Sequence, residues 1–556
     1  MSMRRLLNKK FLTRFFLLCI NFAKDFRGER IFIKTDEEEG HMKGKLLSVA
    51  VFAFLVLFLA GGAHSWQGRM AGMGDPFGLV ADESDFLIHP SKIAKGEGIK
   101  FYGHYRFNWR DVTDWDYTLS TFRPTMASLG TNWPFRGSGD GFDHDALAGA
   151  AFPLGPGRMG LFFQYAGKRD DFDGKTNEYY YGARYFHTYS MDSDFDSFAF
   201  RLLYGLPMGG FKVGGEIALT YRREENETFN SEDEHATHLW RKNFPFGADT
   251  PWINLFPFMF PYESKYWEAL FKGSLSGAVG PAKVAFTLRG GFIFAGDNNL
   301  DYSVATVPIP SMGAIDMDGD VKGWRMGGEF WLRYPLSKGL SLPFVVRVDY
   351  EKKTRDGNGL GLGPGFTGLS YDYKNRERLF QVETGGGLDK ELNKGTRVAA
   401  GIYYNYIKER SDFVLHELYS IPGFFVDYDH NPYPNQREHR VILRLAGEKE
   451  LCPVVAMRLG LNFFYGWVKE DFTFDLAPTF GLSSVQKSSL DGDHWGIGAS
   501  LGATVKFPGF SLEPFVSGGY QKFDVDGDGF GTSWGLLEMD RLKKEWSIGG
   551  GFSIKF

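Results

Sequence analysis

Cysteine is scarce in this sequence: Cys19 and Cys452 are the only two among 556 residues. A disulfide framework needs several cysteines in a short chain, and a zinc centre needs clustered Cys or His, so neither is predicted. The motif CxxCH does not occur, which excludes covalently attached c-type haem. We therefore expect no cofactor and no resident metal.

Catalytic fingerprints are also missing. No GxSxG, HExxH, P-loop or dinucleotide-binding pattern stands in a fitting context. The glycine-rich run at 359–365 falls in a predicted outer connection and has no helix after it. The net charge of −5 is small for this length and gives no sign of a nucleic-acid partner. The sequence therefore predicts a protein that is not an enzyme and does not bind nucleic acid.

Long apolar runs are absent except near the start. The run at 46–60 has about fifteen residues, short of the ~20 that a membrane-spanning helix needs. It follows Met42, Lys43 and Lys45, and small residues stand at 63–65, which is the pattern of a secretory signal peptide. We predict a signal at 42–65 and a mature chain from Trp66; a retained anchor is the alternative.

Residues 1–41 precede this complete signal. The Glu-Glu-Gly before Met42 can be encoded by purine-rich codons that spell a ribosome-binding site. We therefore expect Met42 to be the true start and 1–41 to be a non-native leader. The alternative is a genuine long N-terminal region, which intact mass of the precursor would distinguish.

The end of the chain alternates strictly between two kinds of residue. One phase is apolar or Gly: Trp546, Ile548, Gly550, Phe552, Ile554 and Phe556. The other is polar or Gly: Glu545, Ser547, Gly549, Gly551, Ser553 and Lys555. This alternation, with a period of two residues, predicts a β-strand with one hydrophobic and one polar face. This stretch resembles the last strand of bacterial outer-membrane β-barrels, which implies recognition by the barrel assembly machinery through Phe556.

The same alternation recurs from Ile99 to the end and is interrupted by Gly/Pro-rich tight turns, such as those at 154–157, 207–210 and 280–281. Seven such turns, plus the first and last strands, give about sixteen strands; fourteen is the alternative. The predicted fold is all-β: a closed antiparallel transmembrane barrel over 99–556 with short periplasmic turns. Lipid offers no hydrogen bonds, so the sheet must close on itself.

Long connections on the opposite side are expected to lie outside the cell. They are predicted at 111–142, 170–194, 224–262, 296–320, 354–373, 411–436, 470–490 and 524–543. The chain is thus expected in the bacterial outer membrane, in contact with lipid and lipopolysaccharide.

Residues 66–98 do not alternate and contain Gly72-Met73-Gly74, an Ala-Asp-Glu-Ser run at 81–84, and His89-Pro90-Ser91. This pattern resembles the N-terminus of the long-chain fatty-acid transporter family of outer-membrane barrels. The resemblance implies a hatch folded inside the lumen. It departs from the family where His89, Pro90 and Ser91 replace Asn-Pro-Ala. A short periplasmic tail is the alternative.

Arginine dominates the polar phase of the strands, which we assign to the lumen because a lipid-facing arginine would cost ~2–4 kcal/mol at mid-depth. The expected lumen-lining residues are Arg106, Arg110, Arg201, Arg222, Arg289, Arg325, Arg333, Arg347, Arg397, Arg444, Arg458, Glu216, Glu329 and Asp349. Inward acids are predicted to be fewer. The arginines either pair with acids to brace a plugged barrel or favour anions.

Two outer connections carry further candidates. The aromatic-rich connection at 224–262 is expected to form a constriction or a hydrophobic-ligand site through Trp240, Trp252, Phe256, Phe258 and Phe260. A loop with alternate aspartates, at Asp524, Asp526 and Asp528, is a weak calcium candidate.

These features together favour an outer-membrane channel or transporter for passive passage of small or hydrophobic solutes, the solute itself being unknown. Two alternatives stay open. One is a structural sheath that houses a partner such as a cytochrome, and the other is a receptor or adhesin acting through its loops.

Overall fold

A computed structural model describes most of the predicted barrel and part of the segment before it. The described residues are 70–71, 73, 78–80, 83–95, 97–122, 132–180, 183–232, 262–303, 314–361, 369–393, 395–421, 424–430, 435–476, 484–532 and 535–556. The predicted leader and signal lie outside them, as does the oily connection with Trp240 and Trp252. Those expectations stay predictions.

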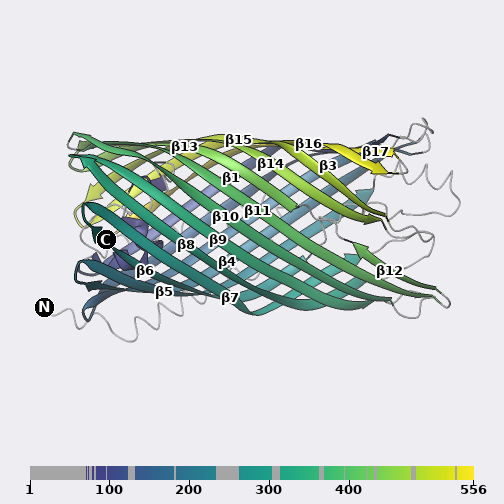
Figure 1. The fold of residues 1–556 in the computed structure, drawn as a ribbon, viewed down its shortest axis with the longest axis horizontal. Coiled ribbons are helices and arrows are strands. Elements are labelled where there is room, and N and C mark those ends of the chain that lie inside the picture. Colours follow the sequence, from purple (N-terminus) through teal and green to yellow (C-terminus); the bar gives the residue numbers. More distant parts are fainter. Residues whose placement is uncertain are drawn as a thin grey trace, which may run out of the picture. The chain divides into compact units, whose positions relative to one another are not determined.

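The described part of the chain forms one antiparallel sheet of seventeen strands. Their bounds are β1 Lys100–Phe122, β2 Asn132–Leu154, β3 Gly157–Tyr180, β4 Ala183–Met208, β5 Phe211–Glu232, β6 Tyr262–Val279, β7 Ala282–Ser303, β8 Ala314–Ser337, β9 Leu340–Gly361, β10 Leu369–Asn393, β11 Thr396–Ile421, β12 Phe424–His430, β13 Asn435–Cys452, β14 Val455–Leu476, β15 Ser484–Phe507, β16 Phe510–Thr532 and β17 Gly535–Lys555. Figure 1 shows them as long strands that are tilted relative to the barrel axis.

The sheet closes because β1 pairs with β2 on one side and with β17 on the other. β12 and β13 both pair with β11, at successive parts of its length, so they share one position in the wall. The described strands therefore fill sixteen positions. This confirms the closed barrel and the count of sixteen rather than fourteen.

Tight connections join the strands at the end of the barrel that carries the C-terminus. Gly155 and Gly209 have φ of 58° and 59°, a region that residues with a Cβ rarely adopt. The chain can therefore reverse there in two residues, and the predicted tight turns are confirmed.

The strands are longer than expected at the other end. β3 and β4 continue to Tyr180 and Ala183, and β16 and β17 to Thr532 and Gly535. The prediction of long irregular connections at 170–194 and 524–543 is therefore wrong. Backbone groups pair as well above the membrane as within it, so polar sequence there extends the hairpins.

The two faces of the wall differ as the alternation predicts. On β5, Ile217 and Leu219 are 49% and 44% exposed on the outer face, whereas Glu216 and Thr220 are buried on the inner face. A closed sheet with an oily exterior and a polar interior is the architecture of a transmembrane barrel. Among the described residues, no helix has the length and apolar character required to cross a membrane.

Two short 3-10 helices precede the first strand: η2, Glu83–Leu87, and η3, Pro90–Lys95. They lie inside the barrel near the tight-turn end, drawn in purple in Figure 1. η3 contacts β3, β4, β5 and β6.

Candidate functional site

The inner wall forms a recess for η3 where three glycines replace side chains. A Cβ on Gly214 of β5 would lie 2.3 Å from the Ser91 backbone nitrogen. A Cβ on Gly205 or on Gly160 would lie 2.7 Å from Ile93. Real Cβ atoms do not approach this closely, so the helix packs on bare backbone. Any side chain at Gly214 must push η3 away from the wall.

Hydrogen bonds hold the same helix in place. The Ser91 amide donates to Ser274 Oγ at 2.6 Å, and the Ser91 hydroxyl donates to Ser276 Oγ at 2.8 Å. Just upstream, the Leu87 carbonyl accepts from Arg201 Nη2 at 3.0 Å and from Lys272 Nζ at 2.9 Å. Charge-assisted bonds of this kind are about twice as strong as neutral ones.

His89 lies between the two helices and is fully buried. Its Nδ1 shares a hydrogen bond of 2.7 Å with the Thr287 hydroxyl, and its ring meets Trp331 edge to face. Its Nε2 is 3.8 Å from Glu329 Oε1 and makes no hydrogen bond among the described residues. Burial, with nearby Lys92, lowers the pKa of His89 to about 2, so the ring is neutral at physiological pH.

Lys92 joins the two helices to each other. Its ammonium is 2.8 Å from Asp85 Oδ2 and lies 4.2 Å above the Trp331 ring. An ion pair and a cation–π contact therefore share one side chain. Lys92 therefore links η2, η3 and β8.

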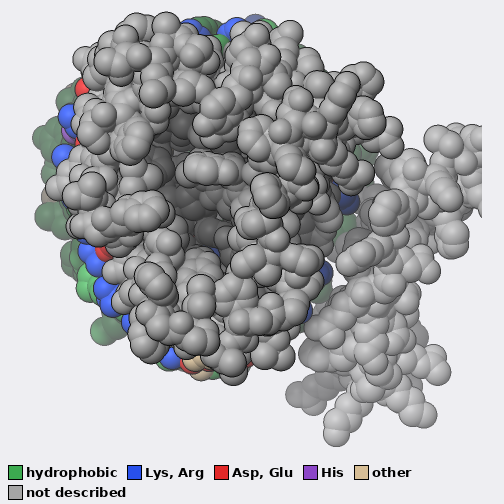
Figure 2. Space-filling view, turned by 90° about the vertical axis from the view of Figure 1, so that its right-hand side faces the viewer, with side chains coloured by type: hydrophobic (Ala, Val, Ile, Leu, Met, Phe, Trp, Pro, Cys, Tyr) green, Lys and Arg blue, Asp and Glu red, His purple; other side chains and the backbone are tan. Residues whose placement is uncertain are grey.

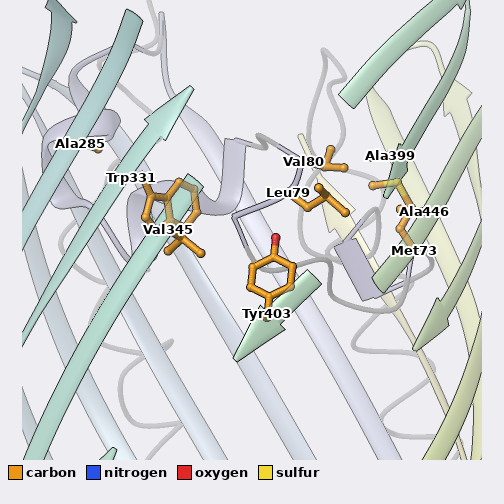
Figure 3. Packing of buried hydrophobic residues seen from close by; sticks show 9 residues of the cluster. All are labelled: Met73, Leu79, Val80, Ala285, Trp331, Val345, Ala399, Tyr403 and Ala446. Carbon is orange, nitrogen blue, oxygen red and sulfur yellow. The ribbon is translucent and has the colours of Figure 1, made fainter. Parts of the chain in front are cut away.

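Apolar contacts complete the seat on both sides of the lumen. Phe86, Leu87 and Ile93 join a buried cluster with Tyr102, Leu147, Ala151, Phe162 and Leu203 of the wall. Met73, Leu79 and Val80 join a second cluster, where Leu79 lies between Trp331 and Val345 on one side and Ala399 and Ala446 on the other (Figure 3). Burying each large side chain contributes about 1.5–3 kcal/mol, so these contacts stabilise the seated state of the described hatch residues.

The predicted hatch residues thus meet at one place. His89, Pro90 and Ser91 are all buried against the inner wall. The substitution of His for the Asn of the resembled pattern is accommodated by Thr287 and Trp331.

The predicted inward arginines all lie in the inward phase of their strands, and ion pairs with carboxylates are common among them. The pairs are Arg110 with Asp143 and Asp170, Arg201 with Glu216, Arg222 and Arg325 with Glu268, Arg289 with Asp349, Arg347 with Glu329, Arg333 and Arg397 with Asp389, Arg444 with Glu383, and Arg458 with Glu448. Arg106 is exposed on the same face of β1.

Sequence reasoning missed many of the acids in these pairs. Asp143, Asp170, Glu224, Glu377, Asp389, Glu438 and Glu448 also form ion pairs on the inner wall. The inner wall of the described strands therefore carries more acids than the sequence prediction named. Asp170 and Glu224 lie in ranges predicted as loops, and the unbroken polar phase of the longer strands was the signal that could have placed them.

One cluster connects strands that are not neighbours. Glu224 of β5 pairs with Lys353 at 3.0 Å and also with Arg355, both on β9. The two cations pair in turn with Glu377 of β10. Tyr266 of β6 donates to Glu224 at 2.6 Å. This clasp, as we call these five residues, joins β5 to β9 and β10 across the intervening strands.

A cavity of about 600 Å³ opens among the tight turns, and most of the residues that line it are polar or charged. Its walls include Arg333, Ser341, Asp389, Arg397 and Glu448. Arg333 Nη2 also donates to the Leu79 carbonyl at 2.8 Å, so the cavity adjoins the hatch.

The other candidates fall elsewhere. Asp524, Asp526 and Asp528 lie within β16 instead of a loop, and Asp524 pairs with Lys522 at 2.6 Å. An extended strand cannot wrap a cation, so the loop prediction is wrong in its geometry. The described residues contain no group of three His, Cys, Asp or Glu placed to hold a metal. Phe258, Phe260 and Phe256 lie outside the described residues.

The end of the barrel opposite the C-terminus is shown in Figure 2, where the described atoms at the outer edge are largely hydrophobic with Lys and Arg among them. These edge groups suit an outer surface that passes from lipid to polar headgroups.

Comparison with known proteins gives likenesses of fold only. No protein-family model and no curated protein matches the chain. Among solved structures, a Pseudomonas aeruginosa FadL homologue is 10% identical, covers 89% of this chain and 99% of its own, and has a TM-score of 0.39. The toluene transporters TodX of Pseudomonas putida and TbuX of Ralstonia pickettii are 12% and 13% identical. Each match covers 88% of this chain and has a TM-score of 0.34. The match covers 98% of TodX and 99% of TbuX.

Proposed function

We propose that this protein is an outer-membrane channel for passive passage of small or hydrophobic solutes, closed at its tight-turn end by an N-terminal hatch. The seating of η3 on Gly214 carries the proposal. A segment held by bare backbone, paired hydroxyls and two cations blocks part of the lumen without any covalent link to the wall there. Such a segment can leave its recess, and passage then needs no further chemistry.

The barrel wall supports the location. Its oily exterior requires a membrane, and the alternating C-terminal strand with Phe556 fits delivery by the barrel assembly machinery. Export through the predicted signal at 42–65 is part of the same proposal.

The sheath and receptor alternatives have less support. A partner protein inside the lumen would compete with η2 and η3 for the space beside β3 to β6. The receptor reading rests on connections outside the described residues.

Planar-bilayer conductance of a variant with one added methyl group in the η3 recess tests the proposal. Gly214→Ala places a Cβ against the Ser91 backbone, so we expect the open probability to rise several-fold while the wall stays intact. Gly273→Ala is the matched control: it lies on adjacent β6, and nothing lies within 4 Å of its added Cβ. Equal conductance in the native protein and both variants would contradict a hatch at this place.

A further inference from the structure

The inner wall is divided into two unlike parts. The part from β3 to β10 carries the η3 recess, the clasp and most of the paired charges. The part from β14 through β17 to β1 contains a region where nearly all inward side chains are short and polar or absent. Register partners there form two rows across five strands: Gly460, Ser500, Ser517, Gly549 and Asn108, and Asn462, Gly498, Gly519, Ser547 and Arg110.

Solvent reaches this second part, which we call the short-chain strip. Asn462, Gly498, Ser517, Gly519 and Ser547 are all half-buried, although no side chain of the strip faces lipid. Ser500 is 5% exposed, and its hydroxyl makes no hydrogen bond among the described residues. The strip therefore presents half-buried amides and hydroxyls to the lumen, with the buried hydroxyl of Ser500 behind them.

The outer face of the same strands has the opposite character. Ile497, Leu501, Val516 and Ile548 are 46–54% exposed toward lipid. Within the two rows no inward side chain is apolar. The inward aromatic rings nearby, Phe464 and Phe515, lie over Gly496 and Gly551 beside the rows. An apolar solute on the strip would have to desolvate amides and hydroxyls without replacing their hydrogen bonds, which is unfavourable.

The charged side chains near the strip indicate which net charge a solute can have. Arg110 at the end of one row is held by Asp143 and Asp170, and Arg444 on neighbouring β13 is paired with Glu383. Paired charges present little net potential to a passing ion. These two arginines therefore give the strip little preference for anions over cations.

We infer that the solute of this channel is a small, uncharged, hydroxyl-rich molecule that passes along the short-chain strip. The inference rests on the proposed function and specifies its substrate class. A polyhydroxylated solute can exchange its water hydrogen bonds for those of Asn108, Ser517, Ser547 and Asn462, and the missing side chains leave it room.

The experiment combines two probes with one bulky substitution in the full-length, hatch-displaced Gly214→Ala protein. Arabinose influx is followed by liposome swelling, and entry of N-phenyl-1-naphthylamine is followed by fluorescence in Gram-negative cells that carry the protein. Gly498→Trp places a large side chain on the strip, where the added Cβ meets only a backbone oxygen at 3.7 Å. Gly273→Trp is the lipid-facing control, and Ser517→Trp is a second strip variant in case the first does not fold.

We expect arabinose to enter, and Gly498→Trp or Ser517→Trp to slow it by about three-fold or more because pore width sets passage. Gly273→Trp should leave the rate unchanged, and the apolar probe should not respond to any variant. Entry of the apolar probe with exclusion of arabinose would overturn the substrate class and leave the channel standing. Arabinose entry that is insensitive to both strip variants would overturn the route. Entry of neither probe would overturn the proposed function itself.

Discussion

At the scale of single residues, His89 links hatch seating to pH. Its pKa is about 2 when seated, and a released histidine has a pKa near ~6.5. The seated state therefore binds fewer protons, so its stability is full above pH ~6.5 and falls by about 1.4 kcal/mol per unit of pH below it. The charged groups around the ring are Lys92, Lys272, Arg289, Glu329 and Arg347. We expect the open probability in bilayers to rise about ten-fold between pH 7.5 and pH 5.5.

His89→Gln is the control for this prediction. Glutamine can keep a hydrogen bond to Thr287 and cannot titrate, so its conductance should not follow pH over the same range. A parallel pH response in the variant and the native protein would assign the effect to another group.

At the scale of elements, the clasp braces β5 against β9 and β10. Glu224→Gln removes the shared partner of Lys353 and Arg355, although Glu377 still contacts both cations. We expect a loss of about 1–3 kcal/mol in the free energy of unfolding, measured with denaturant in lipid vesicles. Asp171→Asn is the matched control, because its pair with Arg169 is exposed and should change stability by less than about 0.5 kcal/mol.

The clasp also marks where sequence reasoning stops. Alternation places Arg222, Arg289 and Arg347 on the inner face correctly, and Gly/Pro signals locate the tight turns. It cannot say which inward side chains meet across several strands, because that depends on the curvature of the closed wall. Nor can it separate a polar strand above the membrane from a polar loop, as β3 and β4 demonstrate.

At the scale of the whole molecule, the cost of placing a charge on the hydrophobic exterior should depend on its depth in the membrane. Leu288 is 57% exposed in the first third of β7, beyond the tight connection, and Leu451 is 56% exposed directly beside a tight turn. Leu288→Arg should cost about 2–4 kcal/mol in vesicles and Leu451→Arg only about 0–1. The measurement is denaturant unfolding of both variants in the same lipid. Equal costs at the two positions would mean that β7 does not cross the hydrocarbon layer as we describe.

The seam between β1 and β17 has a consequence for biogenesis. His104 and Ser553 share a hydrogen bond of 2.7 Å although 449 positions separate them in the chain. β17 therefore completes the enclosure by pairing with both β1 and β16. Loss of this strand leaves β1 and β16 as two open edges whose backbone groups have no partner in lipid, so assembly of the wall depends on the C-terminal segment being intact.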